Sequence, residues 1–99
     1  MICIEEGHKY ELEGNQELRF LKKTRVEGTG ELQTVYTGTT NEEMLAVLID
    51  RTTTLNKAFP CIENENALTH MQQALHWFEL RTSKRQSQGV EGKAAGHAS

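Results

Sequence analysis

The only proline of this 99-residue chain, Pro60, divides its C-terminal half into two stretches of helical periodicity. Proline lacks the amide proton that a helix interior requires, and it biases the residue before it away from helical dihedral angles. Only a few residues around Pro60 join the two stretches. They are therefore predicted to form two helices that pack side by side as an antiparallel hairpin.

The first helix is predicted to begin at Asn41 and to continue to about Lys57. Thr40 and Glu43 have the spacing of a capping box, in which each side chain bonds to the backbone amide of the other residue. Apolar residues then recur at helical spacings, with Thr52 on the same face. These apolar residues are Met44, Leu45, Val47, Leu48, Ile49 and Leu55.

The second helix is predicted to open near Glu63 or Asn64, with Asn64 as its N-cap. It continues to about Gln86, and Gly89 is the expected C-cap. Trp77 and Phe78 are expected in the core or in a subunit interface. The apolar stripe of this helix is Ala67, Leu68, Met71, Ala74, Leu75 and Phe78.

Residues 2–38 read as two to four short antiparallel strands, because glycine-containing turns at 13–15 and 27–30 separate weakly alternating segments. The predicted fold class is α+β, with a small N-terminal antiparallel β-sheet followed by the two-helix hairpin. A single domain over 1–99 is expected. It comprises a strand-rich part (1–38), the helical hairpin (39–88) and a tail (89–99) that is flexible or docked on a neighbour.

A chain of this size has little core, so we do not expect a deep active-site cleft within one subunit. We expect a shallow site or a site shared between subunits. The net charge of −3 argues against coating nucleic acid by bulk charge. No apolar run approaches the ~20 residues of a membrane span, and residues 1–6 lack the pattern of a signal peptide. A cytoplasmic protein is the default expectation. Cys3 and Cys61 are then expected to be buried thiols rather than a disulfide.

No metal or cofactor is predicted. The four histidines never lie three or four residues apart, and no Cys-x-x-Cys occurs. Cys61 follows Pro60 at a helix entrance, where a thiol can be activated, but no histidine lies nearby to act as a base. A small buried side chain at the bend is the preferred interpretation of Cys61, and the sequence shows no catalytic arrangement.

The charges are unevenly distributed. Five glutamates oppose one lysine in residues 1–18, whereas Arg19, Lys22, Lys23 and Arg25 oppose one glutamate in residues 19–27. The role of this 19–25 basic stretch is left open.

Arg81 and Arg85 are four residues apart on the last helix, so their guanidinium groups lie one turn from each other. Two such groups suit a phosphate or diphosphate, although cations in a last helical turn also simply stabilise the helix dipole. Phe59 could stack on a nucleobase or plug the core at the bend.

Several segments of the chain resemble a phage family. Its closing pattern runs from Arg81-Thr82 through Arg85 to Gly89-Val90-Glu91-Gly92. The matching segments before it are residues 40–51, Phe59-Pro60-Cys61, Glu63-Asn64, Ala67-Leu68-Thr69 and Ala74-Leu75-His76-Trp77. Together they look like the C-terminal helical hairpin of the Thoeris anti-defence sponges, which is also similar to that of anti-CBASS cyclic-nucleotide sponges. The resemblance spans about 39–93, and residues 1–38 match only as a strand-rich segment.

The resemblance implies a homo-oligomer, a dimer or a larger ring such as a hexamer. It implies binding, without cleavage, of a cyclic ADP-ribose isomer made by bacterial immune sensors, in the cytoplasm of the infected host. Some members also hold cyclic di- or trinucleotides. Asn64, Arg81 and Arg85 correspond to ligand contacts, and Phe59 is a weaker candidate for stacking on the adenine. Relatives usually have an arginine immediately before the Glu-Asn pair, where this chain has Ile62.

The length of the second helix has a consequence for the site. About 22 helical residues span ~33 Å, so Asn64 and Arg85 cannot meet within one subunit, and a site that uses both must be built across subunits. The function predicted from the sequence is a non-enzymatic sponge for a cyclic ADP-ribose-type signal, with no nucleic acid or membrane partner. The alternatives are an interaction protein whose hairpin binds and inhibits a host protein, and a small nucleic-acid binder that uses residues 19–25.

Overall fold

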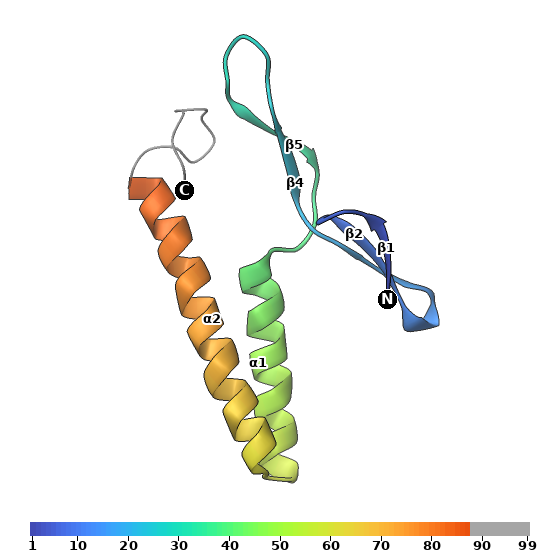
Figure 1. The fold of residues 1–99 in the computed structure, drawn as a ribbon, viewed down its shortest axis with the longest axis vertical. Helices are drawn as coiled ribbons and strands as arrows, with labels where there is room; N and C mark the ends of the chain where they lie inside the picture. Colours follow the sequence, from blue (N-terminus) through green and yellow to red (C-terminus); the bar gives the residue numbers. More distant parts are fainter. Residues whose placement is uncertain (88–99) are drawn as a thin grey trace. The chain divides into compact units, whose positions relative to one another are not determined.

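The structure, a computed structural model, describes residues 1–87. They form two compact units, Met1–Thr40, which contains the strands, and Asn41–Ser87, which contains two helices (Figure 1). The predicted α+β class, with antiparallel strands followed by a helical hairpin, is confirmed. The division between the units falls between residues 40 and 41 of the chain, close to the expected boundary at 38/39. The single-domain organisation stays a prediction. Gly89 and the tail 89–99 lie outside the described residues.

The N-terminal unit contains two antiparallel sheets (Figure 1). The first has the order β1 (Ile2–Glu5), β2 (Lys9–Leu12) and β3 (Gln16–Arg19), and the second pairs β4 (Lys22–Arg25) with β5 (Leu32–Tyr36). The prediction of two to four strands is wrong: residues 1–87 contain five. Each is only four or five residues long, too short for a clear alternation of apolar residues. The predicted turns are confirmed, with positive φ at Gly14, Gly28 and Gly30.

The chain after β5 returns to lie against the end of β3. The backbone N–H of Thr39 donates to the Arg19 carbonyl at 2.9 Å, and the N–H of Leu21 donates to the Thr39 carbonyl at 2.9 Å. A Cβ at Gly38 would lie 2.5 Å from the Arg19 carbonyl oxygen, closer than Cβ atoms approach in proteins. Glycine is required at position 38 because the two backbones pass so close together.

A polar cluster links the two sheets. The Glu5 carboxylate accepts hydrogen bonds from the Tyr36 hydroxyl and from the Lys22 ammonium, the latter at 3.3 Å, and His8 Nδ1 lies 4.0 Å from the same oxygen. The Tyr36 hydrogen bond is the main cause that lowers the pKa of Glu5. Partial desolvation opposes it, and Lys22 and Lys9 add smaller contributions that also lower this pKa. Desolvation, and then the bond to Glu5, raises the pKa of Tyr36 to about 12.

The second unit is an antiparallel hairpin of α1 (Asn41–Ala58) and α2 (Ile62–Ser87) (Figure 1). α1 starts where the capping pattern predicts. The half-buried residues of α2 alternate at spacings of three and four, as in a two-helix seam. They include Cys61 just before the helix, then Asn64, Leu68, Met71, Leu75, Phe78, Thr82 and Arg85, and they face a matching set on α1 formed by Glu42, Leu45, Ile49, Thr52 and Asn56.

Several side chains that the periodicity predicts to be internal are exposed instead. On α1, Val47, Leu48 and Leu55 have 54%, 42% and 47% of their surface exposed. None of residues 1–87 is buried in the isolated chain. One helical partner can cover only one stripe of each helix, and the remaining apolar residues stay open to solvent.

Asn56 and Cys61 close the bend between the helices. The Cys61 amide donates to Asn56 Oδ1 at 3.0 Å, and the Asn64 amide donates to Cys61 Sγ at 3.4 Å. α2 begins at Ile62, one or two residues earlier than predicted, so Cys61 occupies the capping position and the expectation of Asn64 as the N-cap is wrong. The expectation of buried thiols is also wrong: Cys3 is exposed and Cys61 half-buried, both as free thiols.

Glu5→Gln is expected to destabilise the N-terminal unit at neutral pH. Because folding lowers the pKa of Glu5 from its ordinary value of 4.5, its stabilisation is present above that pH and disappears as the pH falls through the folded value. Tyr36 behaves oppositely, and its stabilisation disappears as the pH rises from 10 through about 12. Denaturant midpoints can be followed by near-ultraviolet circular dichroism of the tyrosines, both in this unit. Glu6→Gln is the matched control, and an offset from wild type that stays constant from neutral to acidic pH would contradict the prediction.

Asn56→Ala is expected to destabilise the hairpin by about 1 kcal/mol, because the Cys61 amide loses its acceptor at the bend. Fluorescence of the single tryptophan, Trp77, during denaturation reports on this unit. Asn66→Ala, an exposed asparagine of α2, is the control. Equal denaturant midpoints for the two variants would show that the Asn56 bond contributes nothing to stability.

Candidate functional site

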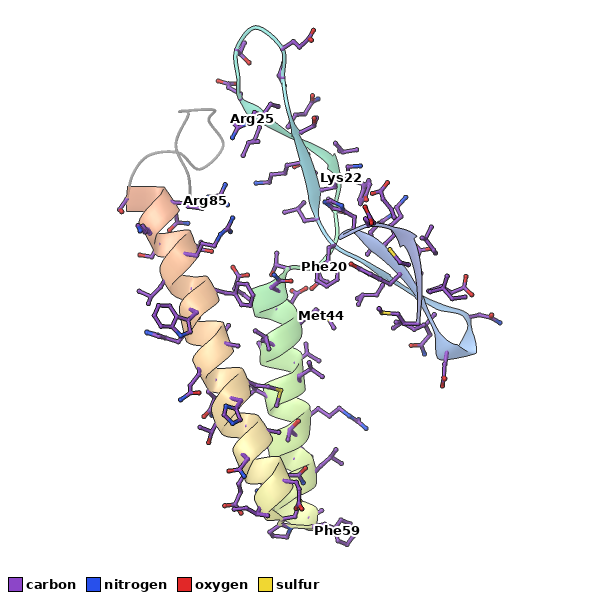
Figure 2. All side chains as sticks on the ribbon, in the orientation of Figure 1. Phe20, Lys22, Arg25, Met44, Phe59 and Arg85 are labelled. Atoms are coloured by element: carbon purple, nitrogen blue, oxygen red, sulfur yellow. The ribbon has the colours of Figure 1, made fainter. Side chains whose placement is uncertain are left out.

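All four predicted ligand contacts lie on the helical unit, but at its two ends. Asn64 is in the first turn of α2 and Arg81 is in its last turns. Figure 2 shows Phe59 at the bend and Arg85 near the other end of α2. The helical rise separates Asn64 from Arg81 by ~26 Å and from Arg85 by ~32 Å. Phe59 and Asn64 thus lie near one end of the helical unit and Arg81 and Arg85 near the other, so one chain does not bring all four residues together.

Arg85 differs from Arg81 although both are on the last turns of α2. Arg85 is half-buried at the end of the helix seam, while Arg81 is exposed. The Nε atom of Arg85 is buried and has no hydrogen-bond partner among residues 1–87. A buried donor without an acceptor costs roughly 1–3 kcal/mol, and guanidinium groups bind carboxylates and phosphates through paired N–H donors. An anionic oxygen that accepted a hydrogen bond from the Arg85 Nε would remove this cost, so Arg85 is the residue of this region best suited to bind an anion.

Phe59 and Asn64 present an aromatic ring and an amide group at the bend. The side chain of Phe59 is 81% exposed, so the alternative of a core plug is wrong for the isolated chain. Asn64 is half-buried and follows Cys61 in the seam. Ile62 is 63% exposed and adds an apolar side chain to the same end.

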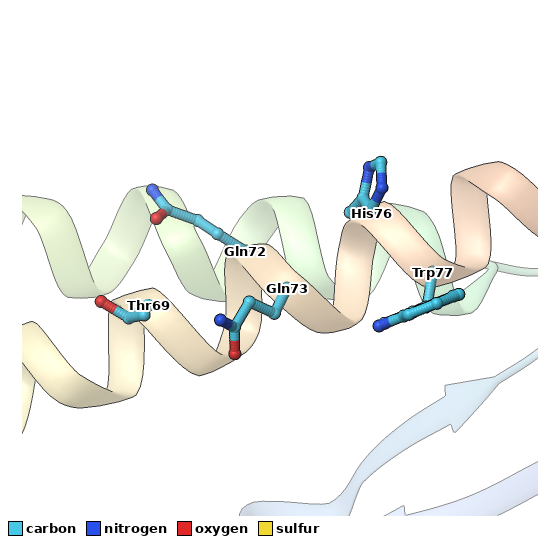
Figure 3. A pocket seen from close by; sticks show the side chains of 5 residues that line it. All are labelled: Thr69, Gln72, Gln73, His76 and Trp77. Atoms are coloured by element: carbon cyan, nitrogen blue, oxygen red, sulfur yellow. The ribbon is translucent and has the colours of Figure 1, made fainter.

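Trp77 is prominent in the structure although the sequence pattern places it in a core or interface. It is 70% exposed, so the core alternative is wrong for the isolated chain. Together with Thr69, Gln72, Gln73 and His76 it lines an open concavity of about 500 Å³ (Figure 3). A second concavity, of about 590 Å³, continues along α2 from Trp77 past Arg81 to Lys84. The signal in the sequence is the spacing 69, 73, 77, 80, 84, which defines the face of α2 opposite the seam.

Three cations of the 19–25 basic stretch contribute to the fold of the N-terminal unit. Arg19 and Lys9 lie over the Tyr36 ring, at 5.4 and 4.7 Å from its centre, and Lys22 bonds to Glu5. Arg25 Nη1 donates to the Gly30 carbonyl at 3.5 Å across the β4–β5 turn. These contacts give the stretch a structural role in its own unit.

Two further observations bear on the chemistry open to residues 1–87. No three His, Cys, Asp or Glu side chains in this range are grouped so that they could hold a metal ion. Neither helix in it is long and apolar enough to cross a membrane.

Comparison with known proteins identifies the family. The family model described as "Acb2/Tad1, hairpin domain" matches residues 22–83. The match therefore begins with the first residue of β4, earlier than the resemblance seen in the sequence, which starts near residue 39. Thoeris anti-defense 1 of Bacillus phage SBSphiJ7 is 41% identical over 56 residues, which are 56% of this chain and 39% of that protein. The chain thus matches about two fifths of the length of this relative.

No solved structure matches the chain. The family match nevertheless covers well over half of its residues, including both strands β4 and β5, all of α1 and most of α2. The resemblance drawn from the sequence is confirmed: the chain belongs to the Acb2/Tad1 hairpin-domain family.

Proposed function

We propose that this protein is a phage anti-defence sponge, which binds and holds a cyclic ADP-ribose isomer, the Thoeris signal, without cleaving it. The observation that carries the proposal is the buried Nε of Arg85, which has no hydrogen-bond partner within the described part of the chain, with Arg81 one turn away in a chain of this family. A diphosphate oxygen could accept the hydrogen bond that the Arg85 Nε does not make. The printed name of the phage relative, Thoeris anti-defense 1, supports the same function.

The binding site is completed by a second copy of the chain. The adenine stacks on Phe59 and bonds to Asn64 at the bend of one copy, and the diphosphate binds Arg81 and Arg85 of the other. The ~32 Å between Asn64 and Arg85 in one helix supports this arrangement. Exposed Val47, Leu48 and Leu55 of α1 provide an aliphatic surface on which a second copy can pack. The assembly is a dimer or a hexamer, and cyclic di- or trinucleotides are additional ligands.

Sequestration works by mass action in the cytoplasm of the infected host. The sponge must bind the signal more tightly than the host effector does and must be present in comparable amounts. It is not an enzyme, so no bond of the ligand breaks. With Ile62 in place of an arginine, the phosphate-binding charge comes from Arg81 and Arg85.

Isothermal titration of the protein with the cyclic ADP-ribose isomer tests the proposal. Saturable binding is expected, with intact ligand recovered after heat denaturation, and hydrolysed ligand would make the protein an enzyme. Arg85→Ala is expected to weaken binding roughly 10- to 100-fold, because a charged hydrogen bond to the ligand is lost. Lys57→Ala, at an exposed lysine of α1, is the matched control. Unchanged affinity in Arg85→Ala would remove that residue from the site.

Complementation tests whether two copies share the site. Asn64→Ala and Arg85→Ala are each expected to bind poorly alone. When the two variants are unfolded and refolded together, mixed assemblies contain some sites in which both residues are wild type, and binding returns in part. Failure to recover binding, with mixed assembly verified by mass spectrometry, would place the whole site in one copy.

The aliphatic residues of α1 also favour a second candidate function, an interaction protein that binds and inhibits a host protein. Light scattering separates the two. A monomer that binds no cyclic nucleotide would favour the host-protein alternative, whereas an oligomer that binds the signal supports the sponge.

A further inference from the structure

Two oppositely charged side chains of the helical unit lie at the same end of its seam. Within residues 41–87, Glu42 is the only acidic residue that is half-buried, and Arg85 is the only basic one. Glu42 is in the first turn of α1 and Arg85 is in the last turns of α2, and these two ends adjoin because the helices are antiparallel. Charged groups that are withdrawn from water are normally paired, so an ion pair is expected between them.

The two charges do not pair. Among residues 1–87 no carboxylate forms an ion pair with Arg85, and its buried Nε has no acceptor. The Glu42 carboxylate instead accepts a hydrogen bond from the Thr82 hydroxyl, with 3.0 Å between Oγ1 and Oε2. Thr82 is the seam position about one turn before Arg85, ~4.5 Å away along the helix axis. The carboxylate is thus held at one seam position, while the guanidinium occupies the next.

The partner of Arg85 decides how well this residue can bind an anion. A guanidinium that donates to a carboxylate has fewer N–H groups to offer, and the nearby negative charge repels a phosphate. A phosphate would then have to displace the carboxylate before it could bind. The apparent affinity falls in proportion to the fraction of molecules in which the guanidinium is available. A hydrogen bond that keeps Glu42 away from Arg85 therefore favours the binding-competent state.

We propose that Thr82 is a positioning residue of the anion-binding site, whose hydroxyl holds the Glu42 carboxylate away from Arg85 so that Arg85 stays available for a phosphate. The proposal rests on the proposed function, in which Arg85 binds the diphosphate of the ligand. Thr82 acts through Glu42 and does not itself contact the ligand. Without the hydroxyl, the carboxylate loses its donor while the Arg85 Nε still lacks an acceptor, so the two side chains pair with each other.

Nitrogen-15 NMR of the arginine side chains tests the position of Glu42 without any ligand. The Nε–H signal that disappears in Arg85→Lys belongs to Arg85. Thr82→Val, which has the shape of threonine but no hydroxyl, is expected to move this proton signal downfield, because Nε–H then donates to a carboxylate. Adding Glu42→Gln to that variant is expected to move the signal back toward its wild-type position. An unchanged Arg85 signal in Thr82→Val would overturn the proposal.

Calorimetry with the cyclic ADP-ribose isomer measures the effect on binding. Thr82→Val is expected to weaken binding roughly 5- to 10-fold, the equivalent of one hydrogen bond that the ligand must break. Thr82→Ser keeps the hydroxyl and is expected to bind like wild type. Glu42→Gln is expected to restore the affinity of Thr82→Val. Glu79→Gln, which removes the charge of an exposed glutamate of α2, is the matched control and is expected to leave that affinity low.

Two binding results would contradict the proposal. If Glu42→Gln does not restore the affinity of Thr82→Val, Thr82 either contacts the ligand or only stabilises the seam. If Thr82→Ser binds as weakly as Thr82→Val, the hydroxyl is not the group that matters. Trp77 fluorescence during denaturation identifies a variant that does not fold, and Thr82→Ala, which also lacks the hydroxyl, then replaces Thr82→Val.

The two measurements separate this proposal from the proposed function. If the wild-type protein does not bind the isomer, the proposed function fails, while a shifted Arg85 signal in Thr82→Val still supports the role of Thr82. If wild type and Thr82→Val bind the isomer equally well and Arg85→Ala binds it weakly, the proposed function stands and the positioning role is refuted.

Discussion

The seam between α1 and α2 is the contact on which the helical unit depends. Residues spaced alternately by three and four face one another along both helices, with Leu68, Leu75 and Phe78 among those of α2. Hydrogen bonds close both ends: Asn56 accepts from the Cys61 amide at the bend, and the Thr82 hydroxyl donates to Glu42 at 3.0 Å near the open end. The next seam position after Thr82 is Arg85. The register of the packing therefore decides that this guanidinium is half-buried while Arg81 is exposed.

A single seam leaves most of the hairpin surface uncovered, and this limitation shapes its function. Two faces remain, with different chemistry. The exposed residues Val47, Leu48 and Leu55 of α1 are aliphatic, whereas the face of α2 opposite the seam combines Trp77 with hydroxyl, amide and ammonium groups. A chain with so little core of its own gains stability when its exposed apolar residues pack against another polypeptide. The site that we propose between two copies uses this principle, because contacts that bury apolar surface also bring distant residues together.

The N-terminal unit is held by different physics. Its two small sheets have few apolar residues, and polar contacts connect them. Glu5 accepts hydrogen bonds from Tyr36 and Lys22, while Lys9 and Arg19 lie over the Tyr36 ring. The basic stretch that looks like a nucleic-acid signal in the sequence is thus largely engaged within the unit. The family match includes β4 and β5, so the hairpin-domain family model covers part of this unit as well as the helices.

The sequence by itself determined the hairpin. A change of period after residue 38, a capping pattern at Thr40 and the single proline are local signals, and local backbone chemistry places the start of α1 at Asn41. It also showed the turns around Gly14 and Gly28. The number of strands could not be predicted correctly from the sequence, because four-residue strands contain too few alternations of apolar and polar residues. Asn64 was expected to be the N-cap, a position that Cys61 occupies, because asparagine is the commoner capping residue.

Burial was decided only by the tertiary structure, because burial depends on which neighbours cover a side chain and not on its own type. Helical spacing alone places Leu48, Leu55 and Trp77 near apolar stripes, yet a single partner helix leaves all three exposed. The same reason separates Arg85 from Arg81, which the sequence treats as an equivalent pair. Periodicity defines the faces of a helix, and packing decides which of those faces is covered.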